Sequence, residues 1–289
     1  MNRHATWKRQ WNEEGYVVVR GLFPPERAAR LLGILERILG RWRVASAETG
    51  KPGGGPDAIS MRHMNHPGYF EPDNRHEFLE LMEAGADPGV LDFVRTILGG
   101  APLFRCFSHF FNPLHKKEDG NWHRDSQFGT PDPEEEKKAI LDRAHNFSDG
   151  VQLQIPLVPS DDIEFVPGSH LRWDTPEELR VRLSEGKKHN REPLPGALRL
   201  ALQPGDAAAF NSCGLHRGRY HADKPRRTLM LTYTTAQRAP FDYFTDQPWF
   251  LEPGYLDGLH PEARAFYERF ILNFREAWAQ KAEPQAAAI

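Results

Sequence analysis

A series of short strand candidates between residues 103 and 234 constrains the fold more than any other feature of this chain. Turn residues such as Asn112-Pro113, Pro167-Gly168 and Pro204-Gly205-Asp206 separate the candidates. Many short strands between such turns are typical of a β-sandwich or a β-barrel. We therefore expect a mainly β fold with flanking helices. The strand candidates are rich in β-branched and aromatic residues and cover 103–111, 151–158, 163–166, 207–210 and 228–234.

Helical segments flank this β region on both sides. Apolar residues recur at helical spacing in 26–42 and 90–98, and 16–20 is a further strand candidate. No linker divides the chain, although 289 residues would allow two domains. We expect a single domain over residues 1–289, with a helical part at about 1–100, a core at about 101–236 and a C-terminal helix at about 261–281. Four aromatic residues spaced four apart predict one buried stripe on that last helix: Phe266, Phe270, Phe274 and Trp278.

Charge and composition exclude several functional classes. The formal net charge is −3 and the pI about 6.5, so the chain lacks the basic footprint of a nucleic-acid-binding protein. No apolar stretch approaches the length of a membrane span, and the N-terminus lacks the apolar region of a secretory signal. Only Cys106 and Cys213 occur, and we interpret them as free thiols in a reducing compartment. We expect a cytoplasmic protein that binds neither nucleic acid nor membranes, of unknown oligomeric state.

His123, Asp125 and His216 form a candidate metal site. In a strand, residues two apart point to the same face, so His123 and Asp125 would present an imidazole and a carboxylate to one point. His216 follows a tight turn and a small apolar strand, and it supplies a second imidazole. Two histidines and one carboxylate leave positions open on Fe(II) for an oxidant and O2. A structural zinc site would instead require four ligands, usually cysteines, and the chain has no cysteine cluster.

An arginine close behind His216 points to a second charged ligand. Arg227 opens the strand candidate 228–234. A buried guanidinium is costly without an anionic partner, and its planar fork matches a carboxylate bidentately. We therefore expect Arg227 to bind the distal carboxylate of 2-oxoglutarate, whose other end would chelate the metal. Arg226 is the rival, and as the adjacent strand residue it should point to the opposite face.

The order of these motifs resembles the phytanoyl-CoA dioxygenase family. It runs from His123-x-Asp125 through the turn Val166-Pro167-Gly168-Ser169-His170 to His216 and Arg227. The segment 12–23, NEEGYVVVRGLF, is also similar to the N-terminus of that family, so the resemblance covers residues 10–235. The family often has Asn-Gly before the strand that leads into this turn, whereas this chain has Asp161-Asp162.

The resemblance implies a double-stranded β-helix, which is a cupin-like jelly roll, and a dependence on Fe(II), 2-oxoglutarate and O2. It implies that His123, Asp125 and His216 hold the metal and that Arg227 binds 2-oxoglutarate. Gln154 and Asn112 are weaker candidates for co-substrate contacts. The position of Gln154 resembles one that contacts 2-oxoglutarate in the family, and Asn112 ends the strand before His123.

The implied function is a dioxygenase that hydroxylates a C–H bond of a small-molecule substrate and releases succinate and CO2. Two alternatives are a non-oxidative cupin-like metalloenzyme and a non-catalytic, ligand-binding jelly roll. The position of Arg227 after His216 favours the oxygenase over both. A halogenase is disfavoured, because Asp125 would take the coordination site that a halide needs. Loops determine function in such folds, and we expect the charged segment 127–150 to form a mobile lid.

Overall fold

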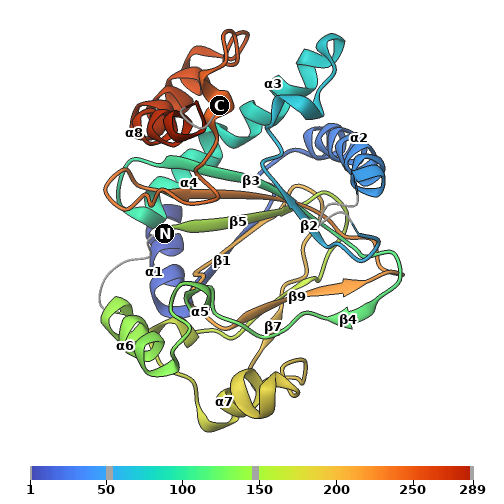
Figure 1. Cartoon of the computed structure of the whole chain (residues 1–289). Coiled ribbons are helices and arrows are strands. Elements are labelled where there is room, and N and C mark those ends of the chain that lie inside the picture. Colours follow the sequence, from blue (N-terminus) through green and yellow to red (C-terminus); the bar gives the residue numbers. More distant parts are fainter. Residues whose placement is uncertain (1, 50–54, 145–149, 287–289) are drawn as a thin grey trace.

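Two antiparallel sheets form the centre of the protein (Figure 1). The computed structural model describes residues 2–49, 55–144 and 150–286. The small sheet has the order β4-β9-β6-β7, with β4 at Lys117–Asp119, β9 at His216–His221, β6 at Ile163–Phe165 and β7 at Leu198–Arg199. The large sheet has the order β1-β8-β5-β10-β3-β2, formed by β1 (Tyr16–Val19), β8 (Ala207–Phe210), β5 (Val151–Pro156), β10 (Arg227–Thr234), β3 (Leu103–Phe111) and β2 (Ser60–Arg62). The expected jelly roll is thus confirmed.

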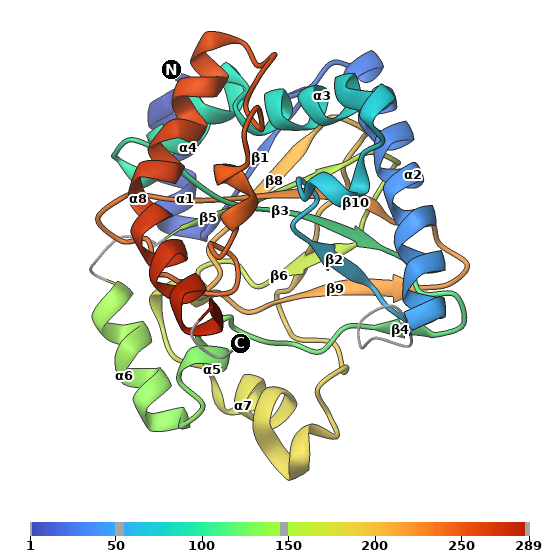
Figure 2. The same cartoon turned by 45° about the horizontal axis from the view of Figure 1, so that its top comes forward.

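Helices cover the outer face of the large sheet, while shorter helices lie near the small sheet (Figures 1 and 2). The covering helices are α1 (Arg3–Glu14), α2 (Pro25–Thr49), α3 (Arg75–Gly85), α4 (Pro88–Leu98) and α8 (Pro261–Ala286). The shorter ones are α5 (Ser126–Gly129), α6 (Pro133–Ala144) and α7 (Pro176–Leu183). Short 3-10 helices occur at Pro67–Tyr69, Pro72–Asn74, Ser169–Leu171, Ser184–Lys187 and Pro248–Leu251.

Alternation along the central strands separates an apolar core from a second, more polar interior. On β10, Leu229, Leu231 and Tyr233 are fully buried in the core beneath the helices. The intervening residues, among them Met230 and Thr232, face a cavity between the two sheets. Both faces of this strand are therefore buried, one by helices and the other by the opposite sheet.

The aromatic stripe of α8 packs into the core, as its spacing predicted. Phe266, Phe270, Phe274 and Trp278 are each exposed by 2% or less. The Phe270 ring meets Phe104 of β3 edge-on, with centroids 5.1 Å apart. This stripe fixes α8 across the large sheet.

Composition-based expectations agree with the structure where it tests them. Cys106 and Cys213 are thiols and are not joined in a disulfide. Within the described ranges, no helix combines the length and the apolar character that crossing a membrane would require. The cytoplasmic location and the lack of nucleic-acid binding stay predictions.

Acid sensitivity is expected from His109, which is fully buried in β3. Burial lowers its pKa to about 3, although Nδ1 donates a hydrogen bond to the Thr228 carbonyl. Since an unfolded histidine titrates near 6.5, the unfolded state alone takes up this proton as the pH falls from 6.5 toward 3. At pH 5 this uptake lowers the free energy of unfolding by about 2 kcal/mol.

Urea unfolding of His109→Gln at pH 7 and pH 5 measures this contribution. The variant should lose about 2 kcal/mol less than the parent between these two pH values. His115→Gln, at an exposed position, should follow the parent. An unchanged pH dependence in His109→Gln would contradict the assignment.

Candidate active site

A cavity of about 1510 Å³ lies between the two sheets and contains the predicted metal ligands. His123, Asp125 and His216 all line it. Their ligand atoms lie within 4.8 Å of one another. The Asp125 Oδ1 atom is 3.6 Å from His123 Nε2 and 3.5 Å from His216 Nε2. The three side chains therefore converge on one point, as the sequence predicted.

Backbone pairing brings the two histidines together across the sheet. The amide of each donates to the carbonyl of the other, at 3.1 and 3.0 Å. Their rings lie 4.2 Å apart between centroids. This isolated bridge joins the loop before α5 to the first residue of β9.

Asp125 reaches the site from a different backbone conformation than expected. It has φ −64° and ψ −22°, in the helical region, and it directly precedes α5. Its amide donates to the Ser212 carbonyl at 2.8 Å, which fixes the turn. The strand alternation that we assumed for His123 and Asp125 is therefore wrong, although the convergence that it predicted is correct.

Hydrogen bonds orient each of the three side chains. The Nδ1 atoms of His123 and His216 donate to the carbonyls of Asn121 and Gly214, at 2.7 and 2.9 Å. This leaves both Nε2 lone pairs directed toward Asp125, the arrangement that metal-ligating histidines generally show. Gln152 of β5 donates through Nε2 to Asp125 Oδ2 at 2.5 Å.

The electrostatics of the site keep the ligands in the form that binds a cation. Burial, together with the nearby His216, lowers the pKa of His123 to about 4, so its imidazole is neutral at pH 7. Burial acts to raise the pKa of Asp125, but its contacts with His216, His123 and Gln152 outweigh burial and lower this pKa. Asp125 is therefore a carboxylate, and the set can accept a divalent metal.

Arg124 lies between the first two ligands in sequence, but its side chain is fully buried outside the cavity that the ligands line. Its Nε and Nη2 atoms both donate to Asp174 Oδ1, at 2.9 and 2.7 Å. Its Nη1 atom donates to the carbonyls of Ser169 and Cys213, at 2.8 and 2.5 Å. Arg124 thereby links the segment that carries the first two ligands to the turn that precedes the third.

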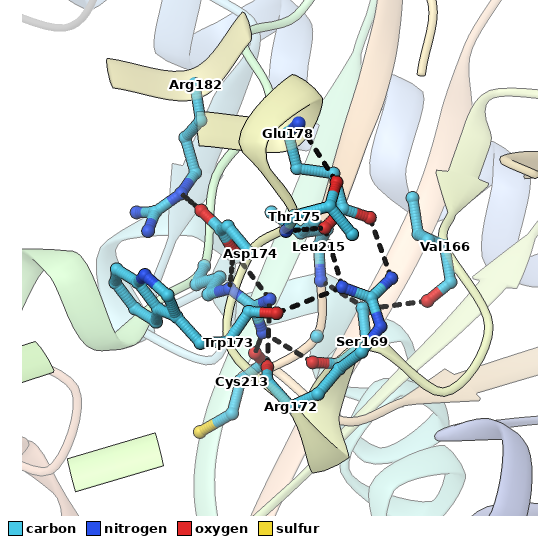
Figure 3. Close-up of polar contacts among 12 residues, drawn as sticks. Val166, Ser169, Arg172, Trp173, Asp174, Thr175, Glu178, Arg182, Cys213 and Leu215 are labelled. Carbon is cyan, nitrogen blue, oxygen red and sulfur yellow. Dashed lines mark hydrogen bonds and ion pairs between the residues drawn. The ribbon is translucent and has the colours of Figure 1, made fainter. Parts of the chain in front are cut away.

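The Val-Pro-Gly-Ser-His turn contributes to the same support (Figure 3). The Ser169 hydroxyl donates to the Val166 carbonyl at 2.6 Å and accepts from the Leu215 amide at 2.8 Å. Leu215 immediately precedes the ligand His216. The Val-Pro-Gly-Ser-His turn thus supports the segment that carries His216, and it does not itself supply a metal ligand.

Helix α6 is tied to this network through Arg182 and Glu136. Arg182 Nε donates to Asp174 Oδ2 at 2.6 Å (Figure 3), and its Nη1 donates to Glu136 Oε2 at 2.9 Å. Both side chains are almost fully buried. Ser126, which follows Asp125, donates to the other Glu136 oxygen at 2.7 Å.

This anchoring limits the expected lid. A buried ion pair links α6 to the network behind the metal ligands, which disfavours movement of this helix as part of a lid. Residues 127–130, which include the exposed Phe128, line the cavity. Residues 145–149 lie outside the described residues. The lid over residues 127–150 stays a prediction, and residues 127–130 are best placed for it because they line the cavity.

The structure reverses the roles expected for the two arginines at the start of β10. Arg227 points toward α2, where Nε meets Glu36 Oε1 at 2.5 Å and Nη1 meets Asn112 Oδ1 at 2.6 Å. Arg226 faces the cavity and is 2% exposed. The two side chains do point to opposite faces, but our assignment of Arg227 to the cavity is wrong. Strand alternation fixes the relative orientation of neighbours but cannot say which face is the cavity when both are buried.

The Arg226 guanidinium has only loose polar contacts. Its Nη2 lies 3.4 Å from Gln154 Oε1, and its Nε lies 3.9 Å from the Asp162 carboxylate. Nε is buried and lacks a hydrogen-bond partner in the described part of the chain. The group lies over the Tyr220 ring at 4.7 Å, and a Cβ at Gly218 would approach Nη1 to 2.6 Å. Glycine at 218 therefore leaves the space that this arginine occupies.

The two weaker candidates have different outcomes. Gln154 lines the cavity beside Arg226, as expected of a co-substrate contact. Asn112 does not line it, because its Oδ1 accepts from Arg227 and its Nδ2 donates to the Pro113 and Ala222 carbonyls. The interpretation of Asn112 as a co-substrate contact is therefore wrong. Gln152, which shares a strand face with Gln154, donates to Asp125.

The comparison with known families agrees with this site. A family model described as phytanoyl-CoA dioxygenase matches residues 11–228, well over half of the chain. The chain belongs to the phytanoyl-CoA dioxygenase family. Membership makes it an oxygenase that depends on iron and 2-oxoglutarate. No curated protein sequence matches it significantly.

Solved structures share the fold of this phytanoyl-CoA dioxygenase family member. EctD from S. alaskensis, with 2-oxoglutarate and 5-hydroxyectoine, has a TM-score of 0.57 and 18% identity over 90% of this chain and 86% of its own. AviO1 from Streptomyces viridochromogenes Tue57 has a TM-score of 0.55 and 17% identity, covering 82% and 97%. The carbocyclase SnoK from nogalamycin biosynthesis has a TM-score of 0.53 and 17% identity, covering 80% and 83%. At these identities the likeness concerns the fold.

Proposed function

We propose that this oxygenase hydroxylates a C–H bond of a small-molecule substrate, with iron held by His123, Asp125 and His216. In the same proposal, Arg226 holds the distal carboxylate of 2-oxoglutarate. The observation that carries it is the presence of a convergent His-Asp-His set and a buried arginine on the walls of one cavity. When bound, iron with 2-oxoglutarate and O2 supplies the oxidising power, and succinate and CO2 are released.

The metal site fits a ferrous ion with open positions. Two imidazoles and one carboxylate are the ligand set of mononuclear non-haem iron oxygenases. No cysteine belongs to the cluster of ligand atoms found in the described residues. The hydrogen bonds at both Nδ1 atoms fix the tautomers in advance, and Gln152 orients the carboxylate.

The spacing along β5 fits 2-oxoglutarate. Gln152 contacts Asp125, whereas Gln154, two residues further, contacts Arg226. Residues two apart in a strand are about 6.6 Å apart, a distance that a five-carbon dicarboxylate can span. One end of the co-substrate would thus lie at the metal ligands and the other at Arg226. There a guanidinium with loose contacts gains a charge-assisted hydrogen bond.

Anaerobic visible spectroscopy separates this proposal from its two alternatives. Fe(II) and 2-oxoglutarate together should give a weak visible charge-transfer band. A non-oxidative cupin-like metalloenzyme and a ligand-binding jelly roll both predict no such band. Absence of the band at saturating iron and 2-oxoglutarate would contradict the proposal.

Oxygen labelling distinguishes hydroxylation from the other oxidative outcomes. Structural neighbours include an epimerase and a carbocyclase, so the fold by itself does not dictate hydroxylation. A substrate library screened for succinate release identifies the substrate first. With labelled O2, one labelled oxygen atom should then appear in the product. Turnover without label in the product would exclude hydroxylation while leaving the oxygenase assignment intact.

A matched pair of variants tests which arginine binds 2-oxoglutarate. Arg226→Gln should raise the Kd for 2-oxoglutarate by about tenfold to a hundredfold, because a hydrogen bond to a charged group contributes about 1.5–3 kcal/mol. Arg227→Gln should leave this Kd unchanged, because its side chain pairs with Glu36 outside the cavity. Titration of the anaerobic visible band measures both constants. A larger increase in this Kd for Arg227→Gln than for Arg226→Gln would show that Arg227 binds 2-oxoglutarate.

A further inference from the structure

A second arginine of the cavity wall has a polar atom without a partner among the described residues. Arg62 is the last residue of β2, at the edge of the large sheet, and it lines the cavity. Its Nη1 atom is buried, and among the described residues this atom has no hydrogen-bond partner. The Arg62 residue is half-buried, and a cationic side chain with a buried donor that lacks a partner favours a bound anion.

Phe110 holds Arg62 close to the proposed co-substrate arginine. The Cζ atom of Arg62 lies 4.7 Å from the Phe110 ring centroid, and that of Arg226 lies 5.0 Å from the same centroid. The two guanidinium carbons are therefore no further apart than the sum of these distances. Cation–π contact with one ring fixes both groups while leaving their hydrogen-bond donors available. An anion bound at Arg62 would thus lie beside the distal end of 2-oxoglutarate.

The register of the sheet places Arg62 at the β2 edge, three strands away from Gln154. Arg62 pairs with Ser108, Ser108 with Met230, and Met230 with Gln154. With neighbouring strands about 4.8 Å apart, the Cα atoms of Arg62 and Gln154 are roughly 14 Å apart along this row. A ligand on Arg62 would therefore enter from the β2 edge and extend toward the metal ligands without taking the position of 2-oxoglutarate.

The charges of the proposed iron and co-substrate complex balance without Arg62. A ferrous ion, the Asp125 carboxylate, doubly charged 2-oxoglutarate and Arg226 together sum to zero. Arg105, also on the cavity wall, is neutralised by its ion pair with Asp242, and Arg191 by its pair with Glu118. Arg62 contributes a positive charge that these pairs do not match.

We propose that Arg62 binds a carboxylate of the primary substrate. This inference rests on the proposed function, because it assigns the substrate class of that same site. The substrate would then be a small organic acid whose carboxylate is anchored on β2 and whose oxidised carbon lies nearer to His123, Asp125 and His216.

Arginine side-chain NMR tests this directly in the full chain loaded with Zn(II) and saturating 2-oxoglutarate. The Nε–Hε signals of Arg62 and Arg226 are assigned by their loss in Arg62→Lys and Arg226→Lys. Hexanoate should shift the Arg62 signal and bind at least about tenfold more tightly than hexanamide, which has the same chain without the charge. Arg62→Gln should weaken hexanoate binding by about tenfold or more. The matched control Arg264→Gln, at an exposed ion pair, should have no effect.

Three results would overturn the inference: an Arg62 signal that does not respond to hexanoate, equal binding of acid and amide, or hexyl phosphate binding about tenfold more tightly than hexanoate. The last would assign the site to phosphate esters. The Arg226 signal tests the proposed function independently of Arg62. This signal should respond to 2-oxoglutarate before any hexanoate is added. An unresponsive Arg226 with a responsive Arg62 would leave an acid-binding cavity without the co-substrate.

Discussion

Replacement of Asp125 by alanine is expected to abolish iron-dependent oxidation and to weaken Fe(II) binding by more than about a hundredfold. Asp125 is the only carboxylate among the three converging side chains. Its loss leaves two neutral imidazoles and no anionic ligand for the metal. Loss of an outer-sphere partner alone typically costs about 10–100-fold in affinity, so loss of the ligand itself should cost more. Anaerobic Fe(II) titration in the presence of 2-oxoglutarate measures the affinity.

Two companion variants make this experiment specific. Gln152→Leu removes the hydrogen bond to Asp125 Oδ2 and should weaken Fe(II) binding by about 10–100-fold. Asp73→Ala removes an exposed carboxylate outside the cavity and should change nothing. If Asp125→Ala binds Fe(II) as tightly as the parent, the metal lies elsewhere and the proposed site is wrong.

Replacement of Asp174 by asparagine is expected to destabilise the protein by about 3–5 kcal/mol. Asp174 is fully buried, and each of its oxygens accepts from a fully buried arginine, Oδ1 from Arg124 and Oδ2 from Arg182. Asparagine keeps the shape but removes the charge and turns an amide donor toward one guanidinium. Thermal unfolding should show a Tm lower by roughly 10 °C.

The same variant should also weaken Fe(II) binding, because Arg124 joins the His123–Asp125 segment to the turn before His216. Asp257→Asn is the matched control, since Asp257 forms an ion pair with Arg264 but is 71% exposed. Such surface pairs contribute about 0–1 kcal/mol. A destabilisation of Asp174→Asn no larger than that of the control would show that the buried network does not hold this part of the fold.

Local patterns in the sequence determined much of this protein. The strand and helix periods predicted most strands of the large sheet, helices α2 and α4, and the aromatic stripe of α8. The two ligand motifs predicted the convergent triad, because their residue types and the turns around them suit one metal. Helices α1 and α3 and strands β2, β4, β7 and β9 were not predicted. Strand β9 is rich in charged and polar residues whose partners lie in distant segments.

Tertiary structure decided which of the two buried faces of β10 lines the cavity. Alternation showed that Arg226 and Arg227 diverge, but helix α2 and its Glu36 determine that Arg227 points outward. The helical conformation of Asp125 and the buried contact between Arg124 and Asp174 likewise depend on segments far apart in the chain. A sequence period records how side chains alternate along one element. The face on which each one finds its partner is set by the packing of other elements, because burial and ion pairing act through space and not along the chain.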